Sequence, residues 1–195
     1  TSTPIKVFVL NTGVYSNTGG QASTASLTGQ DSDLTRFGAA HSGKQEDRKE
    51  LGLIAAFHPN VFVVQTSTAL QGHFLGNVME YLGHDGSPAV LDVYTPCQAE
   101  HGIADSAASH RSRLAVSSRM NPVFVHDPRK GATLHGRFSL DGNPSLDKDW
   151  HTTQLAYKEG DATKLLRVPL TPADFAREET RFKKQFRKLA AAAEP

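Results

Sequence analysis

The sequence is poor in cysteine, in excess charge of either sign and in long apolar runs. Cys97 is the one cysteine among 195 residues, so no disulfide can form within the chain, as is usual in reducing compartments. Lys and Arg number 21 against 20 Asp and Glu, a net charge of +1 that offers no strong field to nucleic acid or an anionic membrane. No apolar run approaches the roughly 18 residues of a membrane span. We therefore expect a cytoplasmic protein that binds neither nucleic acid nor membrane.

The chain begins at Thr1, and a strand-like segment follows within a few residues. These first residues do not show the basic and then apolar pattern of a signal peptide. We expect the chain to be a processed subunit or part of a larger protein. An apolar content of 38% over this length is enough for one core, so we expect a single domain.

Short β-branched segments alternate with a helical pattern. The segments KVFVL (6–10), NVFVVQT (60–66) and PAVLDVYT (88–95) have the near-continuous apolar character of strands covered on both faces of a parallel sheet. Apolar residues that recur at one- and four-residue steps predict a helix that ends at Gly83. These residues are Phe74, Leu75, Val78, Met79 and Leu82. A further strand is expected within 120–128. This order predicts a three-layer α/β fold, with a mostly parallel sheet and helices on both faces.

The remaining regions have less periodicity. Residues 28–50 are polar and contain glycine, which predicts a long loop over the sheet edge. Residues 129–160 are expected to wrap the domain as an irregular, extended arm. From Thr171 onward, a capped start and an apolar face predict a C-terminal helix that packs on the rest of the chain. We therefore expect 1–128 to form the main body and 129–195 an arm and a helix of the same domain.

The first predicted strand ends in a run of small hydroxyl and amide side chains, NTGVYSNTGGQ (11–21). In open α/β sheets ligands bind beyond the carboxyl ends of the strands, which is where this run begins. Its neutral oxygens, and glycines that let backbone groups approach a ligand, suit a diphosphate bridged by Mg²⁺. The same composition is equally typical of a turn without ligand. Neither a P-loop lysine nor a G-x-G-x-x-G fingerprint is present.

Other site chemistries have less support. None of the nine histidines forms an H-x-x-x-H pattern, and Cys97 with His101 is half of a zinc ligand set. No G-x-S-x-G elbow provides a nucleophilic serine. A lone cysteine is ordinarily a small apolar residue. The composition alone therefore leaves a liganded loop and a plain turn as alternatives.

The segment NTGVYSNTGGQAS (11–23) resembles the D-T-E-V-Y-S-N-T-G-G-Q-x-S motif in the thiamin diphosphate-binding domain of pyruvate:ferredoxin (flavodoxin) oxidoreductases. YTPCQAEHGI (94–103) is similar to that family's A-P-C-x-x-H-G-I stretch. The resemblance continues, in the family's order, through KELGLIAAF (49–57), NPVFVHDPR (121–129) and GRFSLDG (136–142). The Gly-Asp-Gly segment that opens the diphosphate motif of thiamin enzymes does not precede Lys6. The resemblance therefore implies the second, C-terminal half of that domain.

The resemblance also implies roles for four residues. Thr12, through its side-chain oxygen, and Val14, through its backbone carbonyl, would bind Mg²⁺. Asn17 would lie beside the diphosphate and the reacting end of thiamin diphosphate, as a catalytic and cofactor-binding residue. Cys97 would be one ligand of a [4Fe-4S] cluster whose other ligands lie outside this chain, because cluster ligation needs thiolate sulfur.

The implied activity of the whole enzyme is oxidative decarboxylation of a pyruvate-type 2-oxoacid, with electrons leaving through iron–sulfur clusters and coenzyme A taking the acyl group. Its implied partners are the remaining domains of the same enzyme and ferredoxin or flavodoxin, and the intact protein is expected to be a homodimer. The chain alone is expected to be inactive.

The sequence departs from the family pattern at two places. The family's Asp and Glu are here Asn11 and Gly13, and one more residue separates Cys97 from His101. These departures remove negative charge beside the expected metal site. They keep open a second function, that of a non-catalytic α/β interaction domain descended from such an enzyme.

Overall fold

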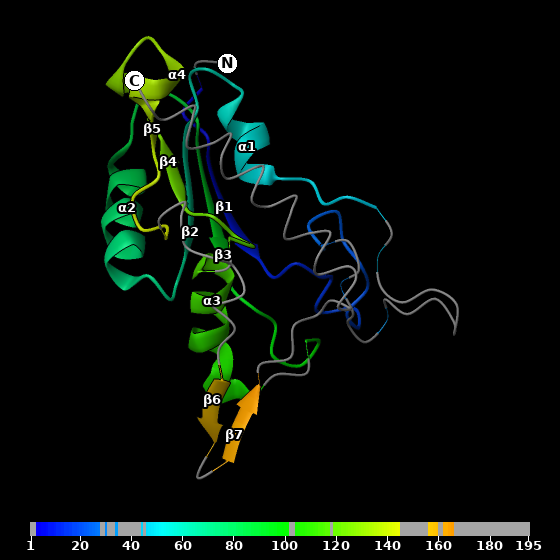
Figure 1. Cartoon of the computed structure of the whole chain (residues 1–195). Helices are drawn as coiled ribbons and strands as arrows, with labels where there is room; N and C mark the ends of the chain where they lie inside the picture. Colours follow the sequence, from blue (N-terminus) through cyan, green and yellow to red (C-terminus); the bar gives the residue numbers. More distant parts are fainter. Residues whose placement is uncertain are drawn as a thin grey trace.

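The computed structural model describes residues 3–27, 30, 34, 44, 46–101, 104–117, 119–144, 156–159 and 162–165. Within them, a five-stranded sheet has the order β1-β3-β2-β4-β5 (Figure 1). Its strands are β1 (Lys6–Asn11), β2 (Phe62–Ser67), β3 (Ala89–Tyr94), β4 (Phe124–His126) and β5 (Phe138–Ser139). A separate antiparallel hairpin joins β6 (Ala156–Glu159) and β7 (Ala162–Leu165).

Helices and short 3₁₀ turns connect the strands. The helices are α1 (Leu51–Ala56), α2 (Gln71–Gly83), α3 (Ala108–Ser117) and α4 (Leu134–Arg137), and the 3₁₀ turns are η1 (Asp105–Ala107) and η2 (Pro128–Lys130). Figure 1 shows the sheet nearly edge-on, with α1 and α2 on opposite faces. None of the helices in the described part of the chain has the length and apolar character to cross a membrane.

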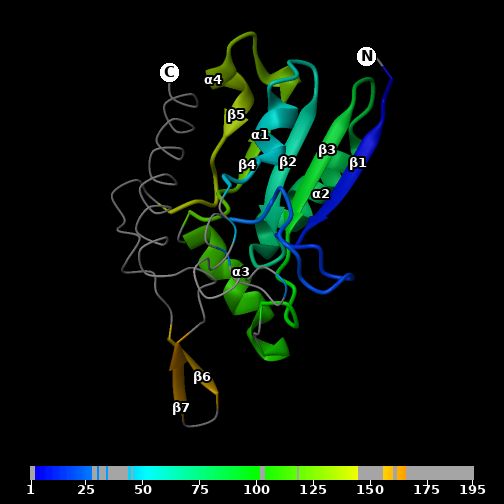
Figure 2. The same ribbon diagram turned by 90° about the vertical axis from the view of Figure 1, so that its right-hand side faces the viewer.

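Three adjacent strands, β1, β3 and β2, are parallel, and this confirms the α/β class. Both β1 and β2 pair in parallel with β3, so that Asn11 and Ser67 each lie opposite Tyr94. The carboxyl ends of these strands therefore meet at one edge of the sheet, with α3 beyond it (Figure 2). Two antiparallel strands, β4 and β5, extend the sheet on the side of β2.

Each face of the sheet has its own apolar core. On the α2 side the buried residues are Phe62, Val64, Tyr81, Ala89, Leu91, Val93 and Val125. On the α1 side they are Ala55, Ala56, Val61, Val63 and Phe124. Helix α1 lies close to the sheet, because a Cβ atom added at Gly52 would overlap Gln65 Oε1 and stand 2.9 Å from the Phe124 ring. Only glycine allows this approach.

Two predicted burial patterns are wrong. β1 was expected to be covered on both faces, but it is an edge strand on which Phe8 is 52% and Leu10 64% exposed (Figure 2). In α2, Phe74 and Val78 pack on the core as expected, whereas three residues of the predicted stripe are exposed: Leu75, Met79 and Leu82. Both exposures have the same physical reason. Within the described part, β1 is paired with a strand along one edge only, and α2 packs against the sheet with one side only.

Residues 129–144 are more regular than the predicted arm. The Asp127 side chain accepts a hydrogen bond from the Arg129 backbone and so caps η2, and Thr133 caps α4 in the same way. β5 then returns antiparallel to β4. The predicted C-terminal helix from Thr171, and most of the predicted loop at 28–50, lie outside the described residues.

Candidate functional site

The loop over residues 11–21 leaves the carboxyl end of β1 beside the segment that leaves β3. The backbone N–H of Thr95 donates to the Asn11 carbonyl over 3.1 Å. Cys97 follows two residues after Thr95 as a half-buried free thiol. The structure thus brings the two motifs of the sequence to one edge of the sheet.

Backbone hydrogen bonds close this loop on itself. Tyr15 N donates to the Gln21 carbonyl over 3.0 Å, and Gly20 N donates to the Tyr15 carbonyl over 3.0 Å. Gly13 and Gly20 have φ angles of 72° and 79°, in the left-handed region that favours glycine. The glycines of the motif are therefore required by the turn itself, whether or not a ligand binds.

The oxygen atoms predicted to bind Mg²⁺ lie side by side. Thr12 Oγ1 donates to the Val14 carbonyl over 2.9 Å, and Ser16 Oγ donates to Thr12 Oγ1 over 3.0 Å. Two oxygens on adjacent corners of an octahedral Mg²⁺ site lie about 3 Å apart, because each is about 2.1 Å from the metal. The donor set therefore fits Mg²⁺ in chemistry, and both oxygens could bind one ion once the Thr12 hydroxyl proton turns away from the Val14 carbonyl. Asn17 is exposed in the same loop.

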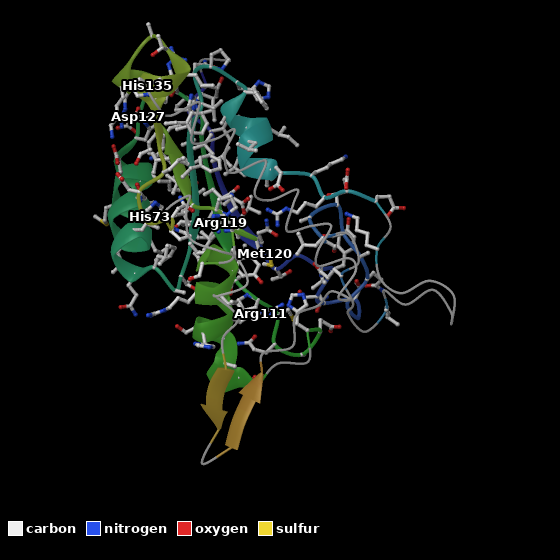
Figure 3. All side chains as sticks on the ribbon, in the orientation of Figure 1. His73, Arg111, Arg119, Met120, Asp127 and His135 are labelled. Atoms are coloured by element: carbon white, nitrogen blue, oxygen red, sulfur yellow. The ribbon has the colours of Figure 1, made fainter. Side chains whose placement is uncertain are left out.

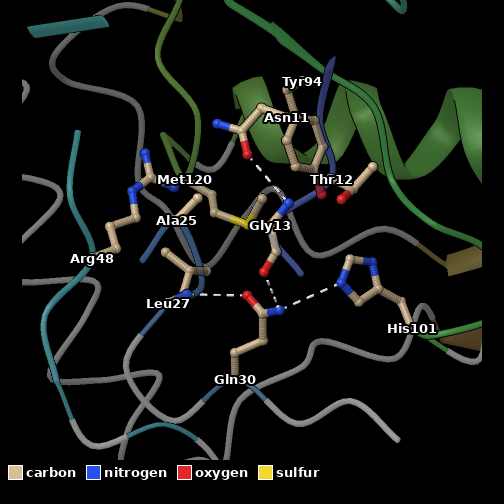
Figure 4. Close-up of a pocket in the computed structure, with 10 residues that line it drawn as sticks. All are labelled: Asn11, Thr12, Gly13, Ala25, Leu27, Gln30, Arg48, Tyr94, His101 and Met120. Carbon is tan, nitrogen blue, oxygen red and sulfur yellow. Dashed lines mark hydrogen bonds between the residues drawn. The ribbon is translucent and has the colours of Figure 1, made fainter. Parts of the chain in front are cut away.

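A small cavity of about 10 Å³ lies behind the loop. Its lining includes Asn11, Thr12, Gln30, Arg48, Tyr94 and His101 (Figure 4). Gln30 Nε2 donates to the Gly13 carbonyl over 2.9 Å, and the Ser26 hydroxyl donates to the same carbonyl. A space of this size admits about one water-sized group, so the described residues do not enclose a molecule as large as a coenzyme.

A buried carboxyl lies on β3 next to the start of the loop. Asp92 is 2% exposed. Burial raises its pKa to about 6, although a hydrogen bond from Asn11 and the charge of Arg48 act in the opposite direction. Arg48 also pairs with Glu50, with 2.6 Å between Nε and Oε1. Asp92 is thus ionised at neutral pH at a cost in stability.

This cost predicts a pH dependence of folding. The pKa of Asp92 is about 6 in the folded chain and 3.8 ordinarily, so the unfolded chain holds fewer protons between these values and the free energy of unfolding falls as pH rises from about 4 to about 6. At about 1.4 kcal/mol per pKa unit, the fall amounts to about 3 kcal/mol and is complete above pH 6.

Urea unfolding of wild type and Asp92→Asn between pH 4 and 8 measures this contribution. The variant should be the more stable protein near neutral pH, and its advantage should shrink as the pH falls towards 4. A difference between the two proteins that stays constant over this range would show that the pKa of Asp92 is not raised.

A second polar group faces the cavity from the segment after β3. Burial, with a smaller contribution from Arg111, lowers the pKa of His101 to about 4, so its ring is neutral at pH 7. Its Nε2 lies 3.4 Å from Gln30 Nε2. Burial raises the pKa of Tyr94, and the nearby charge of Arg111 on α3 acts in the opposite direction. The contact between His101 and Gln30 joins the cysteine segment to the loop.

The histidines do not assemble a metal centre in the described part of the chain. No three His, Cys, Asp or Glu side chains there lie close enough to hold a metal ion. Figure 3 shows His73 and His135 well apart from Arg111 and Met120, which lie near the carboxyl ends of the strands. His73 instead bonds Thr66 Oγ1 over 2.8 Å, and His126 bonds the Val61 carbonyl over 2.9 Å. Cys97 would therefore need ligand partners from outside these residues to hold a cluster.

Several residues around the loop were not predicted from the sequence. Gln30, Ser26 and Arg48 approach it from a polar region with no periodicity. Asp92 had a visible signal, a charged residue inside the apolar segment PAVLDVYT, where an ionisable group is unusual. The sequence located the loop but not the groups that hold it.

The fold and the loop define an α/β domain with an oxygen-rich loop at the carboxyl edge of parallel strands. No family model matches the chain. The chain is 34% identical over 142 residues to a probable pyruvate-flavodoxin oxidoreductase of Escherichia coli, covering 72% of this chain and 11% of that protein. It is 33% identical over 138 residues to pyruvate:ferredoxin oxidoreductase of Moorella thermoacetica, covering 70% and 11%. The PorB subunit of pyruvate synthase from Thermotoga maritima is 31% identical over 110 residues, 56% of this chain and 34% of the subunit.

These similarities show that the chain belongs to the pyruvate:ferredoxin (flavodoxin) oxidoreductase family. The matched region spans about a tenth of the first two relatives and about a third of the PorB subunit. The similarity is thus to one part of much larger proteins.

Proposed function

We propose that the chain forms one wall of a binding site for Mg²⁺ and the diphosphate of thiamin diphosphate, in a larger 2-oxoacid oxidoreductase. The observation that carries this proposal is that Thr12 Oγ1 and the Val14 carbonyl, two oxygen donors of the kind Mg²⁺ prefers, lie side by side in the loop at the carboxyl end of β1. Ser16 supports this pair through its hydrogen bond to Thr12. Asn17, exposed in the same loop, would contact the diphosphate and the reacting end of the cofactor.

The charge of the loop agrees with this role. Residues 11–21 contain neither an acidic nor a basic side chain, so a bound Mg²⁺ would have its charge balanced by the diphosphate. Backbone hydrogen bonds hold the turn that carries these oxygens, so less conformational freedom is lost when the metal binds.

Two observations support a site completed by other parts of a larger protein. The cavity behind the loop admits about one water-sized group, far less than a coenzyme needs. The outer edge of β1 has no paired strand among the described residues, and its apolar side chains Phe8 and Leu10 are exposed. An uncovered apolar edge strand is a favourable surface for a further strand.

The activity that we propose for the whole protein is that of the family, oxidative decarboxylation of a pyruvate-type 2-oxoacid to acyl-coenzyme A. When bound, thiamin diphosphate supplies the electron sink for decarboxylation. Cys97 would give one thiolate to a [4Fe-4S] cluster on the route to ferredoxin or flavodoxin. The meeting of the two motifs at one sheet edge supports this, because the cofactor and the cluster would then be neighbours.

Calorimetric titration of the intact protein with thiamin diphosphate tests the proposal. We expect binding in the presence of Mg²⁺ and its loss when EDTA removes the metal, because the loop offers the diphosphate no cationic side chain. Thiamin without the diphosphate is the matched control and should bind far more weakly. Absence of Mg²⁺-dependent binding would contradict the proposal and favour a non-catalytic interaction domain.

A further inference from the structure

The amide of Gln30 is held in one orientation by groups whose hydrogen-bonding roles are fixed. Gln30 Oε1 accepts from the Leu27 backbone N–H over 3.0 Å, and Gln30 Nε2 donates to the Gly13 carbonyl over 2.9 Å (Figure 4). A backbone N–H only donates and a carbonyl oxygen only accepts, so the amide oxygen and nitrogen cannot exchange places. Gln30 is 3% exposed. It therefore presents a fixed, buried donor to the candidate metal loop.

The second N–H of this amide is directed to the segment that contains Cys97. Gln30 Nε2 lies 3.4 Å from His101 Nε2 (Figure 4). An amide nitrogen only donates, so the His101 nitrogen accepts, which requires a neutral ring with its proton on Nδ1. The His101 backbone N–H donates to the Cys97 carbonyl over 3.2 Å. Gln30 thus bridges the two motifs that meet at this edge of the sheet.

The Gly13 carbonyl lies between the two candidate metal ligands and accepts a second hydrogen bond, from the buried Ser26 hydroxyl. Gly13 separates Thr12 from Val14 and has a φ of 72°. Its backbone N–H donates to Asn11 Oδ1 over 3.2 Å. Both peptide groups that adjoin Gly13 are therefore held by side chains, and these two groups set the relative positions of the Thr12 and Val14 oxygens.

The backbone that carries Ser26 and Gln30 has supports of its own. Lys44 Nζ donates to the Ser26 carbonyl over 2.8 Å, and the Lys44 backbone N–H donates to the Gln30 carbonyl over 3.3 Å. The Gln30 backbone N–H donates to the Leu27 carbonyl over 3.0 Å. None of these three bonds involves Gly13. Loss of either donor to the Gly13 carbonyl should therefore loosen the loop more than the segment that carries the donor.

We propose that Gln30 and Ser26 are positioning residues for the Mg²⁺–diphosphate loop, acting together on the Gly13 carbonyl. This inference rests on the proposed function of the loop. By fixing the peptide group between Gly13 and Val14, the two donors keep the Val14 carbonyl beside Thr12 Oγ1, where both oxygens can bind one metal ion.

Gln30→Met removes the amide but keeps the length of the side chain. Its affinity for thiamin diphosphate at saturating Mg²⁺ should fall by about tenfold, the loss expected when a buried carbonyl loses a donor. The Mg²⁺ concentration needed for half-maximal binding should rise as well, which a general loss of stability would not cause. Gln65→Met is the matched control, because Gln65 is also 3% exposed and donates to a backbone carbonyl, that of Pro122, over 2.7 Å. It should lose stability but bind as wild type.

Ser26→Ala provides a second test that does not depend on Gln30→Met folding. It removes the other donor to the Gly13 carbonyl and is a small change, so the affinity should fall several-fold in a folded protein. Ser87→Ala is its matched control. It removes a hydroxyl that lies 2.7 Å from His84 Nε2, before the amino end of β3 and so at the opposite end of the sheet from the loop. Its affinity should equal that of wild type.

The measurements are calorimetry and thermal unfolding on the intact protein. Undiminished affinity in folded Gln30→Met, or in Ser26→Ala, would overturn the positioning role while wild-type binding kept the proposed function intact. An equal loss of affinity in the matched controls would overturn it too, because the loss would then follow from stability. Absence of Mg²⁺-dependent binding in wild type would remove both.

Discussion

Thr12→Ala is expected to weaken the binding of thiamin diphosphate in the presence of Mg²⁺ by about a hundredfold or more, since loss of even a residue that supports a metal ligand costs about 10- to 100-fold. The variant removes Oγ1, one of the two oxygens that lie 2.9 Å apart in the loop. It also removes the acceptor of the Ser16 hydroxyl. The Val14 carbonyl would remain as the one ligand of the pair, and water would take the vacated corner of Mg²⁺, so the protein would hold the metal and its diphosphate through one contact fewer.

Two substitutions in the same loop provide controls for this experiment. Thr12→Ser keeps a hydroxyl at the same position and should retain most of the affinity. Thr18→Ala removes an exposed hydroxyl whose partner is Gln21 Oε1 at 2.7 Å, away from the oxygen pair, and should change the affinity little. Calorimetry of the intact protein measures all three. An affinity of Thr12→Ala equal to that of wild type would show that Thr12 is not a metal ligand.

Cys97→Ser is expected to remove the signal of one iron–sulfur cluster from the EPR spectrum of the reduced protein. A serine oxygen is a poor substitute for the thiolate that cluster ligation requires. The free, half-buried Cys97 follows the carboxyl end of β3, beside the candidate Mg²⁺ loop. The loss should be near complete for one cluster, with a matching fall in iron and sulfide content.

The neighbouring residue Thr95 supplies the control for this substitution. Its backbone N–H bonds the Asn11 carbonyl, and Thr95→Ser leaves that bond in place, so its spectrum should equal that of wild type. If Cys97→Ser keeps the full set of cluster signals, Cys97 is a free thiol with no part in electron transfer. Thiamin diphosphate binding, measured on the same sample, separates cluster loss from general misfolding.

The regular elements were predictable because each has a local cause. β2 and β3 are short, β-branched and buried on both faces, and their apolar composition reports this. α2 ends at Gly83 as its pattern predicts. The exposure of β1 was not predictable, because the sequence of an apolar strand does not indicate whether the strand lies in the middle or at the edge of a sheet. Strand order, which places β1 outermost, depends on pairings between distant segments.

The candidate site shows the same difference between features with a local cause and features that depend on distant segments. The composition of residues 11–21, with its glycines and small oxygens, was determined locally, and the turn forms through bonds within the segment. Its supports come from elsewhere. Gln30, from a polar region, donates to the Gly13 carbonyl, and His101, from the cysteine segment, lies 3.4 Å from Gln30 Nε2.

The loop, its oxygens and the one thiol of the chain can be identified from the sequence, because they follow from local composition. That the loop and the thiol share one edge of the sheet could not be predicted, because it depends on the pairing of segments far apart along the chain. The parallel pairing of β1 with β3 sets Asn11 opposite Tyr94, three residues before Cys97.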